Sequence, residues 1–323
     1  MKAPTIPFTR LPQPDEHELS STWRLAKPNR IARSLELSQR RNPGGWYVAG
    51  ASSDVGDRSV VRVIAGREVA LWRGQHGRPH AGPGACPHLS APLHGCVVDG
   101  DDLMCRWHGM ALPREGGRGW LEFPAFDDGV LFWVQLATDG EEPSPQPTLP
   151  TRPPLDGSMA AVIAMPAACE PQDIIANRLD PWHGSWFHPY AFSHLTVDES
   201  QSTPDRLVVD VAYRINRTLG VPVRADFTTP DARTIVMTIL EGEGAGSVVE
   251  THATPQLLAA RGRVRTMMIE ATIAYSDRSG FQQARRLSRA IAPLIRHTAR
   301  QLWVDDLAYA ERTYAIRTGQ VAQ

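Results

Sequence analysis

The chain has 323 residues, of which 42% are hydrophobic and 21% charged, and its formal net charge is −1. The length suggests about two domains, and the composition is that of an ordinary globular protein. The balanced charge gives no general basic field for nucleic acid. No stretch approaches the roughly 18 apolar residues of a membrane span, and the opening MKAPTIPFTR lacks a signal-peptide core. We therefore expect a cytoplasmic protein.

The first part of the chain is punctuated by prolines and then becomes rich in short β patterns. Residues 1–43 form an extension with one expected helix near Ile31–Arg41, which should end before Asn42-Pro43. From residue 44 to about 140 we expect an all-β domain. Its strands should be Trp46–Val48, Val60–Ile64, Val69–Trp72, Leu103–Cys105 and Val130–Val134. Residues 141–156 contain six prolines and predict a semi-rigid linker.

The remainder, residues 157–323, mixes strands and helices and predicts an α+β domain. A helix should cover Pro171–His183, and a helical region from about Phe281 to Arg317 should be kinked or interrupted at Pro293. The expected strands are Met159–Met165, Leu207–Ile215, Arg224–Thr228, Thr234–Leu240, Ser247–Ala253 and Val264–Tyr275. The glycines of Gly242–Gly246 should form a hairpin turn, since they open no helix.

The strongest chemical signal is a pair of mixed cysteine–histidine motifs. Cys86-Pro-His88 and Cys105-Arg-Trp-His108 are separated by sixteen residues. Two thiolates suit one iron and two imidazoles suit the other, which is the ligation of a Rieske [2Fe–2S] centre. Zinc also accepts two cysteines and two histidines, but zinc fingers usually pair cysteine with cysteine and histidine with histidine. The mixed order and the β-rich surroundings favour the iron–sulfur cluster.

These residues resemble the Rieske family from Gly44-Gly-Trp-Tyr-Val to Gly129-Val-Leu-Phe-Trp-Val. Respiratory members of that family add a bridging cysteine to each cluster loop, whereas the equivalent residues here are Ala91 and Trp107. Met110 stands where those members place a serine that donates to the cluster. Fewer hydrogen bonds to the cluster imply a low potential, which suits delivery of electrons to an oxygenase. Cys96 has no partner in the second loop and should be a small buried residue.

A second motif follows the linker: Asn177-Arg-Leu-Asp180-Pro-Trp-His183, and then His188. If this segment is helical, the first three polar residues lie near one face, and Gly184 can end the helix and turn His188 inward. Two histidines and one carboxylate form the facial triad of non-haem Fe(II) oxygenases, which leaves positions open for O₂. The alternative interpretation is that both histidines are ordinary polar residues in a tryptophan-rich loop.

Together the two motifs resemble the α subunit of Rieske non-haem iron oxygenases over nearly the whole chain after residue 43. The resemblance implies a helix-grip (START/Bet v 1-like) catalytic domain with an antiparallel sheet. It also implies that the missing carboxylate comes from the Asp305-Asp306 pair of the closing helix, with Asp306 as the iron ligand beside His183 and His188. A solvated acidic pair is the other interpretation of these two residues.

The same resemblance implies the electron path and the partners. Asp180 should bridge His183 to His108 of a neighbouring subunit in a homotrimer. Since the sequence shows neither a plant-type cluster motif nor a nucleotide-binding loop, a separate ferredoxin and/or NAD(P)H-dependent reductase should supply electrons. The reaction should be hydroxylation, dihydroxylation or oxidative demethylation of a small organic substrate by O₂.

Apolar and aromatic residues of the second domain predict a lipophilic substrate. We expect the pocket walls in Ser247–Ala253 and Val264–Tyr275, including Met267-Met268, with additional side chains from Trp186, Phe187, Tyr190 and Phe192. The flanks Gly44–Gly56 and His80–His88 resemble an actinobacterial subgroup associated with carotenoid genes, which makes a carotenoid or another terpenoid a candidate. The alternative function is a Rieske electron-transfer protein with an iron-free second domain; a zinc-stabilised binding module is the third.

Overall fold

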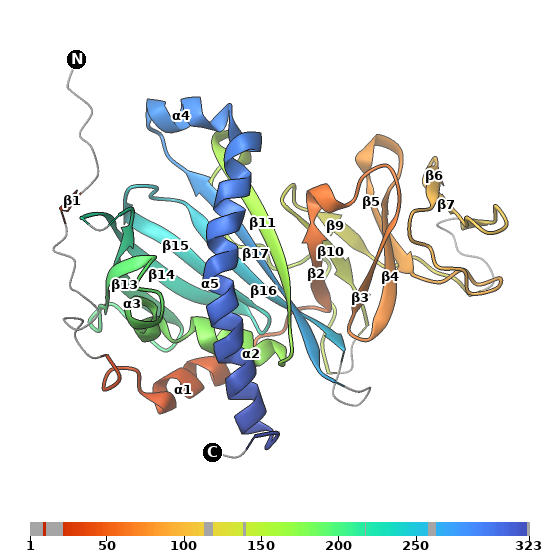
Figure 1. Cartoon of the computed structure of the whole chain (residues 1–323). Coiled ribbons are helices and arrows are strands. Elements are labelled where there is room, and N and C mark those ends of the chain that lie inside the picture. Colours follow the sequence, from red (N-terminus) through yellow and green to blue (C-terminus); the bar gives the residue numbers. More distant parts are fainter. Residues whose placement is uncertain are drawn as a thin grey trace.

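The computed structural model describes residues 9–10, 22–112, 119–137, 140–216, 218–257 and 263–321. Most of the opening decapeptide, on which the signal-peptide expectation rests, lies outside these ranges. Small sheets occupy one end of the molecule, and a large curled sheet crossed by a long helix occupies the other (Figure 1). Within the described ranges, no helix combines the length and the apolar character needed to cross a membrane.

The first part of the chain is built from three small antiparallel sheets, as its short β patterns predict. One sheet consists of β2 (Trp46–Ala51), β10 (Leu131–Gln135) and β9 (Ala125–Asp127). A second consists of β3 (Val60–Ile64), β4 (Arg67–Arg73) and β5 (Pro79–Pro83), and the third of β6 (Val97–Asp99), β7 (Asp102–Met104) and β8 (Ala111–Leu112). Short 3-10 turns lie at η1 (Ser52–Asp54) and η2 (Gln75–Gly77). Alternating residues of β2, β4 and β10 fill a common core.

The second part is one antiparallel sheet with the order β11–β17–β16–β15–β14–β13–β12, and β1 pairs with β14 at its side. The strands are β1 (Thr9–Arg10), β11 (Ser158–Ala167), β12 (Phe192–Val197), β13 (Arg206–Arg214), β14 (Leu219–Asp231), β15 (Thr234–Gly242), β16 (Val248–Leu257) and β17 (Arg265–Tyr275). The sequence pattern missed β12 and gave β14 too short a length. The glycines after β15 form the expected hairpin turn into β16.

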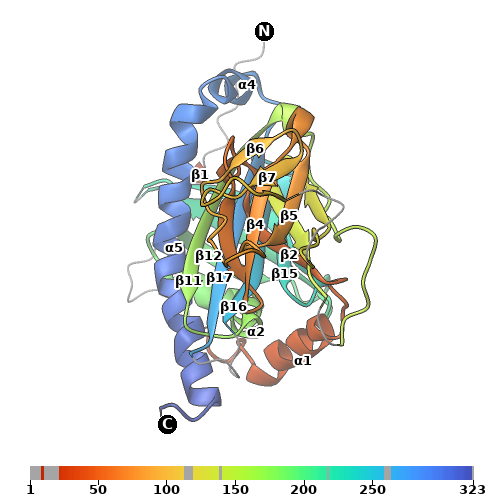
Figure 2. The same ribbon diagram turned by 90° about the vertical axis from the view of Figure 1, so that its right-hand side faces the viewer.

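Helices cover one face of this sheet. They are α1 (Pro28–Gln39), η3 (Leu155–Gly157), α2 (Pro171–Arg178), η4 (Pro181–His183), α3 (Gly184–Phe187), α4 (Ser279–Arg285) and α5 (Ser288–Arg317). The turned view shows α5 along nearly the whole height of the molecule (Figure 2). Its face of Trp303, Asp306, Leu307, Ala310 and Tyr314 is buried. This helix on a curled antiparallel sheet is the expected helix-grip architecture.

Two helix expectations were wrong. The segment Pro171–His183 is not one helix: α2 ends at Arg178, and Asp180 has φ −107° and ψ 77°. Asp180 precedes Pro181, and the proline ring disfavours the α conformation in the residue before it. Gly184 does not end a helix either, since its own φ and ψ (−52°, −51°) are helical and it begins α3. The polar residues of this motif therefore lie on or next to three short elements, α2, η4 and α3.

The closing helical region is interrupted at Arg286–Leu287, between α4 and α5, and not at Pro293 as expected. Pro293 lies near the start of α5, at its sixth residue, and the helix continues through it. A proline removes its own N–H and clashes with the carbonyl four residues earlier. Leu294 and Thr298, on the turns just after this point, already line the cavity described below. Thus one face of α5 lies toward the sheet from the first turns of the helix to its end.

The alternation of side chains along β17 joins the two parts of the molecule. Ile269, Ala271 and Ile273 point toward the first part and pack with Trp46, Val48 and Trp133. The intervening residues Glu270, Thr272 and Ala274 line a cavity on the other face. Because successive residues of a strand point to opposite faces, a single strand supplies both the contact between the two parts and one wall of the cavity.

A buried ion-pair network reinforces this contact. Arg152, in the proline-rich segment, pairs with Asp128 of the first part at 2.8 Å and donates to Glu250 of β16 at 2.6 Å. Trp133 donates its indole N–H to Asp128 at 2.6 Å. Glu250 is fully buried, and the side chains of Arg152 and Asp128 are nearly so. Residues 141–156 thus include an arginine that connects the two parts.

Candidate metal centres and substrate cavity

The two loops that carry Cys86 and Cys105 have the same backbone hydrogen-bond pattern. In each, the cysteine N–H donates to the carbonyl five residues later, and the residue four positions after the cysteine donates back to the cysteine carbonyl. These returning residues have positive φ, 58° at Ser90 and 67° at Gly109. Glycine adopts this conformation without strain, whereas serine does so at a cost. The equal geometry presents two similar loops toward one site.

The four predicted cluster ligands are arranged by chemical type. The Cys86 and Cys105 thiols are buried next to each other, whereas the His88 and His108 imidazoles are exposed, with ring centroids 5.0 Å apart. Burial and the adjacent Cys105 raise the pKa of Cys86, while N–H groups of His88 and Leu89 donate toward its sulfur. Paired thiols inside and paired imidazoles outside fit a [2Fe–2S] cluster with its histidine-bound iron at the surface. Cys96 is fully buried, as expected.

The second predicted site is also brought together. His183, His188 and Asp306 each offer a ligand atom within 4.8 Å of the others, and they form a candidate metal site among the described residues. Asp306 Oδ1 lies 3.1 Å from Nε2 of His183 and 3.0 Å from Nε2 of His188. His183 comes from η4, His188 follows α3 directly, and Asp306 lies on α5. Two imidazoles and one carboxylate converging in this way fit a mononuclear Fe(II).

The electrostatics of this site favour a bound cation. Burial alone would raise the pKa of Asp306, but the hydrogen bonds with His183 and His188 outweigh it and hold the pKa well below its usual range. Burial would lower the pKa of His183, yet Asp180 and Asp306 raise it to about 9. The carboxylate thus keeps its charge at neutral pH, and a metal ion bound there would have to displace the proton that His183 otherwise holds.

Neighbouring side chains orient the three ligands. Asn177 donates from Nδ2 to Oδ1 of Asp306 at 3.2 Å. Tyr190 donates its hydroxyl to Asp305 at 2.7 Å and lies 3.3 Å from Nδ1 of His188. Asp305 is therefore not simply solvated: its carboxylate lies 3.5 Å from Nδ1 of His188, on the side of the imidazole away from Asp306. Such contacts on the far nitrogen fix the orientation of a ligating histidine.

Asp180 lies on the outer side of His183. Its Oδ2 is 3.7 Å from Nδ1 of His183, which is longer than a hydrogen bond, and it accepts a hydrogen bond from Tyr309 at 3.2 Å. Oδ1 of Asp180 and Nδ1 of His183 are buried and have no hydrogen-bond partner among the described residues. A surface depression beside them is lined by Asp180, His183, Trp186, Phe187, Ala308, Tyr309 and Arg312.

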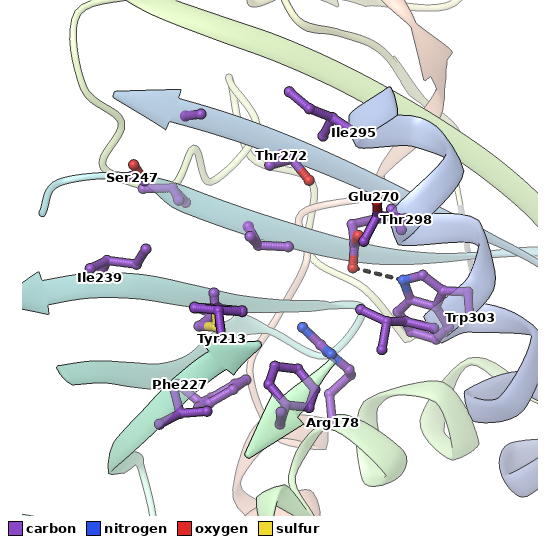
Figure 3. A pocket seen from close by; sticks show the side chains of 18 of the residues that line it. Arg178, Tyr213, Phe227, Ile239, Ser247, Glu270, Thr272, Ile295, Thr298 and Trp303 are labelled. Carbon is purple, nitrogen blue, oxygen red and sulfur yellow. Dashed lines mark hydrogen bonds between the residues drawn. The ribbon is translucent and has the colours of Figure 1, made fainter. Parts of the chain in front are cut away.

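A separate cavity of about 490 Å³ lies between the inner face of the sheet and α5 (Figure 3). Its walls include Val248, Val249, Thr272 and Ala274 of the two predicted strands. Phe192 also lines it, as expected, and its ring lies 6.3 Å from that of His188. The walls are mostly apolar, and the volume lies in the range of small-molecule sites.

Other predicted wall residues lie elsewhere. Trp186 and Phe187 line the outer depression, and the Tyr190 hydroxyl contacts Asp305. Met268 is fully buried in the core, and Met267 packs toward the first part of the chain. Apart from Phe192, the sequence pattern missed the walls on β12, β13, β14, β15 and α5, because side chains of distant strands come together only when the sheet curls.

A Rieske domain followed by a helix-grip domain is the architecture of the α subunit of Rieske non-haem iron oxygenases, and the chain belongs to this class. The Rieske [2Fe-2S] domain model matches residues 45–127. More particularly, the chain belongs to the family described as Domain of unknown function (DUF5914), whose model matches residues 138–321, over half of the chain.

Individual relatives agree with this assignment. The chain is 28% identical to chlorophyllide a oxygenase, chloroplastic, of Oryza sativa subsp. japonica over 193 residues, 54% of this chain and 35% of the relative. It spans about a third of the length of the first curated relatives it matches. The structure of dicamba monooxygenase bound to dicamba matches 87% of this chain and 91% of its own (TM-score 0.59, 16% identity). The oxygenase–ferredoxin complex of carbazole 1,9a-dioxygenase matches 91% and 87% (TM-score 0.52, 12% identity). These two likenesses concern the fold.

Proposed function

We propose that this protein is a terminal oxygenase component that oxidises a small, mainly lipophilic organic molecule with O₂. The observation that carries the proposal is the convergence of His183, His188 and Asp306 beside a largely apolar cavity, in a chain that also bears the two Rieske loops. When bound, the cluster would supply electrons and ferrous iron would supply the position at which O₂ reacts. Hydroxylation, dihydroxylation and oxidative demethylation all fit this arrangement.

The chain's own residues have distinct roles in the proposal. Cys86, His88, Cys105 and His108 would hold the cluster, and His183, His188 and Asp306 would hold the iron. Asn177 and Asp305 would orient Asp306 and His188 through the contacts described above. The apolar walls of the cavity would bind the substrate and exclude water from the reacting positions.

The electron path would cross between subunits. Asp180 would connect His183 to His108 of a neighbouring chain in a homotrimer. The buried Oδ1 of Asp180, without a partner among the described residues, supports this role. Exposed apolar residues also lie at both ends of the path: Leu89 and Trp107 at the cluster loops, and Trp186 and Phe187 around Asp180. Such patches mark protein interfaces.

A separate ferredoxin, with or without an NAD(P)H-dependent reductase, would deliver the electrons. Fold similarity to an oxygenase that is known in complex with a ferredoxin supports this partner class. A carotenoid or another terpenoid remains the candidate substrate from the sequence, and the mostly apolar cavity walls agree with it.

Metal analysis with EPR of the dithionite-reduced protein tests the proposal. An oxygenase should contain about three irons per chain, two of them in a cluster with a Rieske signal. About two irons with the same signal would favour the alternative, an electron-transfer protein with an iron-free second domain. A colourless protein that contains zinc would contradict both.

A further inference from the structure

The cavity contains one permanent cation. Arg178, the last residue of α2, extends from the floor into the chamber, between the side chains of Tyr213 and Trp303 (Figure 3). Its guanidinium carbon lies 5.7 Å from the ring of Phe227 and 5.5 Å from that of Trp303. Stacking on two aromatic rings holds this side chain in place without neutralising its charge.

One donor of Arg178 is unused: its buried Nε has no hydrogen-bond partner among the residues that the structure describes. A buried guanidinium donor without a partner is costly, so it needs a structural or functional reason. Asn177, the preceding residue, contacts Asp306, so Arg178 stands at the end of the cavity closest to the candidate iron ligands.

The acidic residue in the same chamber does not cancel this charge. Glu270 lies on the facing strand and accepts a hydrogen bond from the Trp303 indole at 2.7 Å. Its complete burial raises its pKa, which favours the neutral acid. A metal ion at His183, His188 and Asp306 would add further positive charge near this end. The chamber therefore combines long apolar walls with one electropositive end.

We infer that the cavity binds an apolar molecule that carries one carboxylate, and that Arg178 receives this carboxylate. Arginine presents a planar fork of donors that matches a carboxylate with two parallel hydrogen bonds. The apolar remainder would lie along the walls formed by Val211, Ile239, Val249 and Leu294. This inference rests on the proposed oxygenase function, because it names the class of substrate for the same site.

Paired probes test the inference on the full-length protein as isolated. Octanoate is compared with octanol, and naphthoate with naphthalenemethanol, by isothermal titration calorimetry. Each carboxylate should bind at least about tenfold more tightly than its alcohol, the usual strength of a charge-assisted hydrogen bond. Arg178→Met should bring the ratio to about one, and Arg178→Lys should keep part of it. Glu270→Gln should leave the ratio nearly unchanged, since burial already favours the neutral acid at Glu270.

Arg265→Met, at an exposed position on β17 outside the cavity, is the matched control and should leave the ratio unchanged. Equal affinity of the wild-type protein for carboxylate and alcohol would overturn the inference, and so would an unchanged ratio in Arg178→Met. Should Arg178→Met fail to fold, the wild-type and Arg178→Lys ratios decide. Iron content is measured on the same samples: three irons without carboxylate preference contradict the substrate class alone, whereas two irons contradict the oxygenase.

Discussion

The two candidate metal centres differ in how the chain builds them. The candidate cluster ligands lie within 23 residues, from Cys86 to His108, on two loops that each close their own hydrogen bonds. The candidate iron ligands His183 and Asp306 are 123 positions apart and meet only because α5 packs on the sheet. The first centre is exposed on its histidine side and the second is mostly buried. A local centre can be identified from spacing, whereas a distant one depends on the whole fold.

Of the residues at the second centre, we expect Asp306 to be the one whose removal most readily abolishes metal binding. Asp306→Ala should reduce iron from about three to about two atoms per chain while the Rieske EPR signal stays intact. Asp305→Ala is the comparison: it removes a contact to the other nitrogen of His188 and no ligand, so this variant should retain more iron than Asp306→Ala. Greater loss of iron in the Asp305 variant than in the Asp306 variant would reverse the assignment of the pair.

Arg152 tests whether the two parts depend on each other. Arg152→Met leaves the buried carboxylates of Asp128 and Glu250 without their cation, and this should lower the free energy of unfolding by about 3–5 kcal/mol. Denaturant unfolding measures the change. Arg265→Met, an exposed arginine, should change it by no more than about 0.5 kcal/mol. Equal effects of the two substitutions would mean that the network does not stabilise the contact.

The same network predicts an acid dependence. Burial would raise the pKa of Asp128 and of Glu250. Arg152, with His252 beside Glu250 and the N–H groups of Leu131 and Trp133 beside Asp128, holds both pKa values below their usual 3.8 and 4.5. A carboxyl with a lowered folded-state pKa stabilises the protein above its unfolded pKa, and this contribution is lost as the pH falls through the folded value. The difference in the free energy of unfolding between wild type and Arg152→Met should therefore reach its full size above about pH 4.5 and decrease below that pH. A difference in the free energy of unfolding that increases at acid pH would contradict this prediction.

Asp180 connects the two centres in the proposed assembly. Asp180→Asn should keep both metals but slow oxidation of the reduced cluster by about 10- to 100-fold, the usual effect of losing a carboxylate behind a ligating histidine. Stopped-flow absorbance of the reduced cluster with O₂ and substrate measures this rate. Asp57→Asn, at an exposed position, should leave the rate unchanged. A normal rate of cluster oxidation in Asp180→Asn would contradict the proposed role of Asp180 as a bridge.

The smallest expected effects lie in the cluster loops. Gly109 has φ 67° with open space around a Cβ, so Gly109→Ala should cost about 1 kcal/mol from backbone strain alone. Ser90→Gly should instead relieve strain at φ 58° and change stability by less than about 1 kcal/mol in the favourable direction. Gly280→Ala, in a helix with open space, serves as the control without such strain. Thermal unfolding, followed by the absorbance of the cluster, should give different stabilities for these three variants.

Residue spacing was sufficient for the predicted strands of the first part and for the two cluster motifs. The strand patterns of the first part were confirmed, and the cluster motifs predicted two loops whose equal hydrogen-bond pattern the structure displays. The motif of Asp180, His183 and His188 was recognised, but its local conformation was wrong. Pro181 excludes the continuous helix because it restrains the backbone of Asp180, the residue before it.

Only the tertiary structure decided which distant side chains meet. Nothing in a proline-rich segment distinguishes Arg152 as a buried cation between Asp128 and Glu250, because that role depends on two surfaces that lie far apart in the sequence. In the sequence, Arg178 likewise resembles any other polar residue at the end of a helix. Its role depends on the cavity that β12–β17 and α5 form around it. The sequence by itself determined the ligand types and the order of the domains through local patterns. Burial and long-range packing, which depend on the whole fold, determined the cavity, its single cation and the partner of each buried charge.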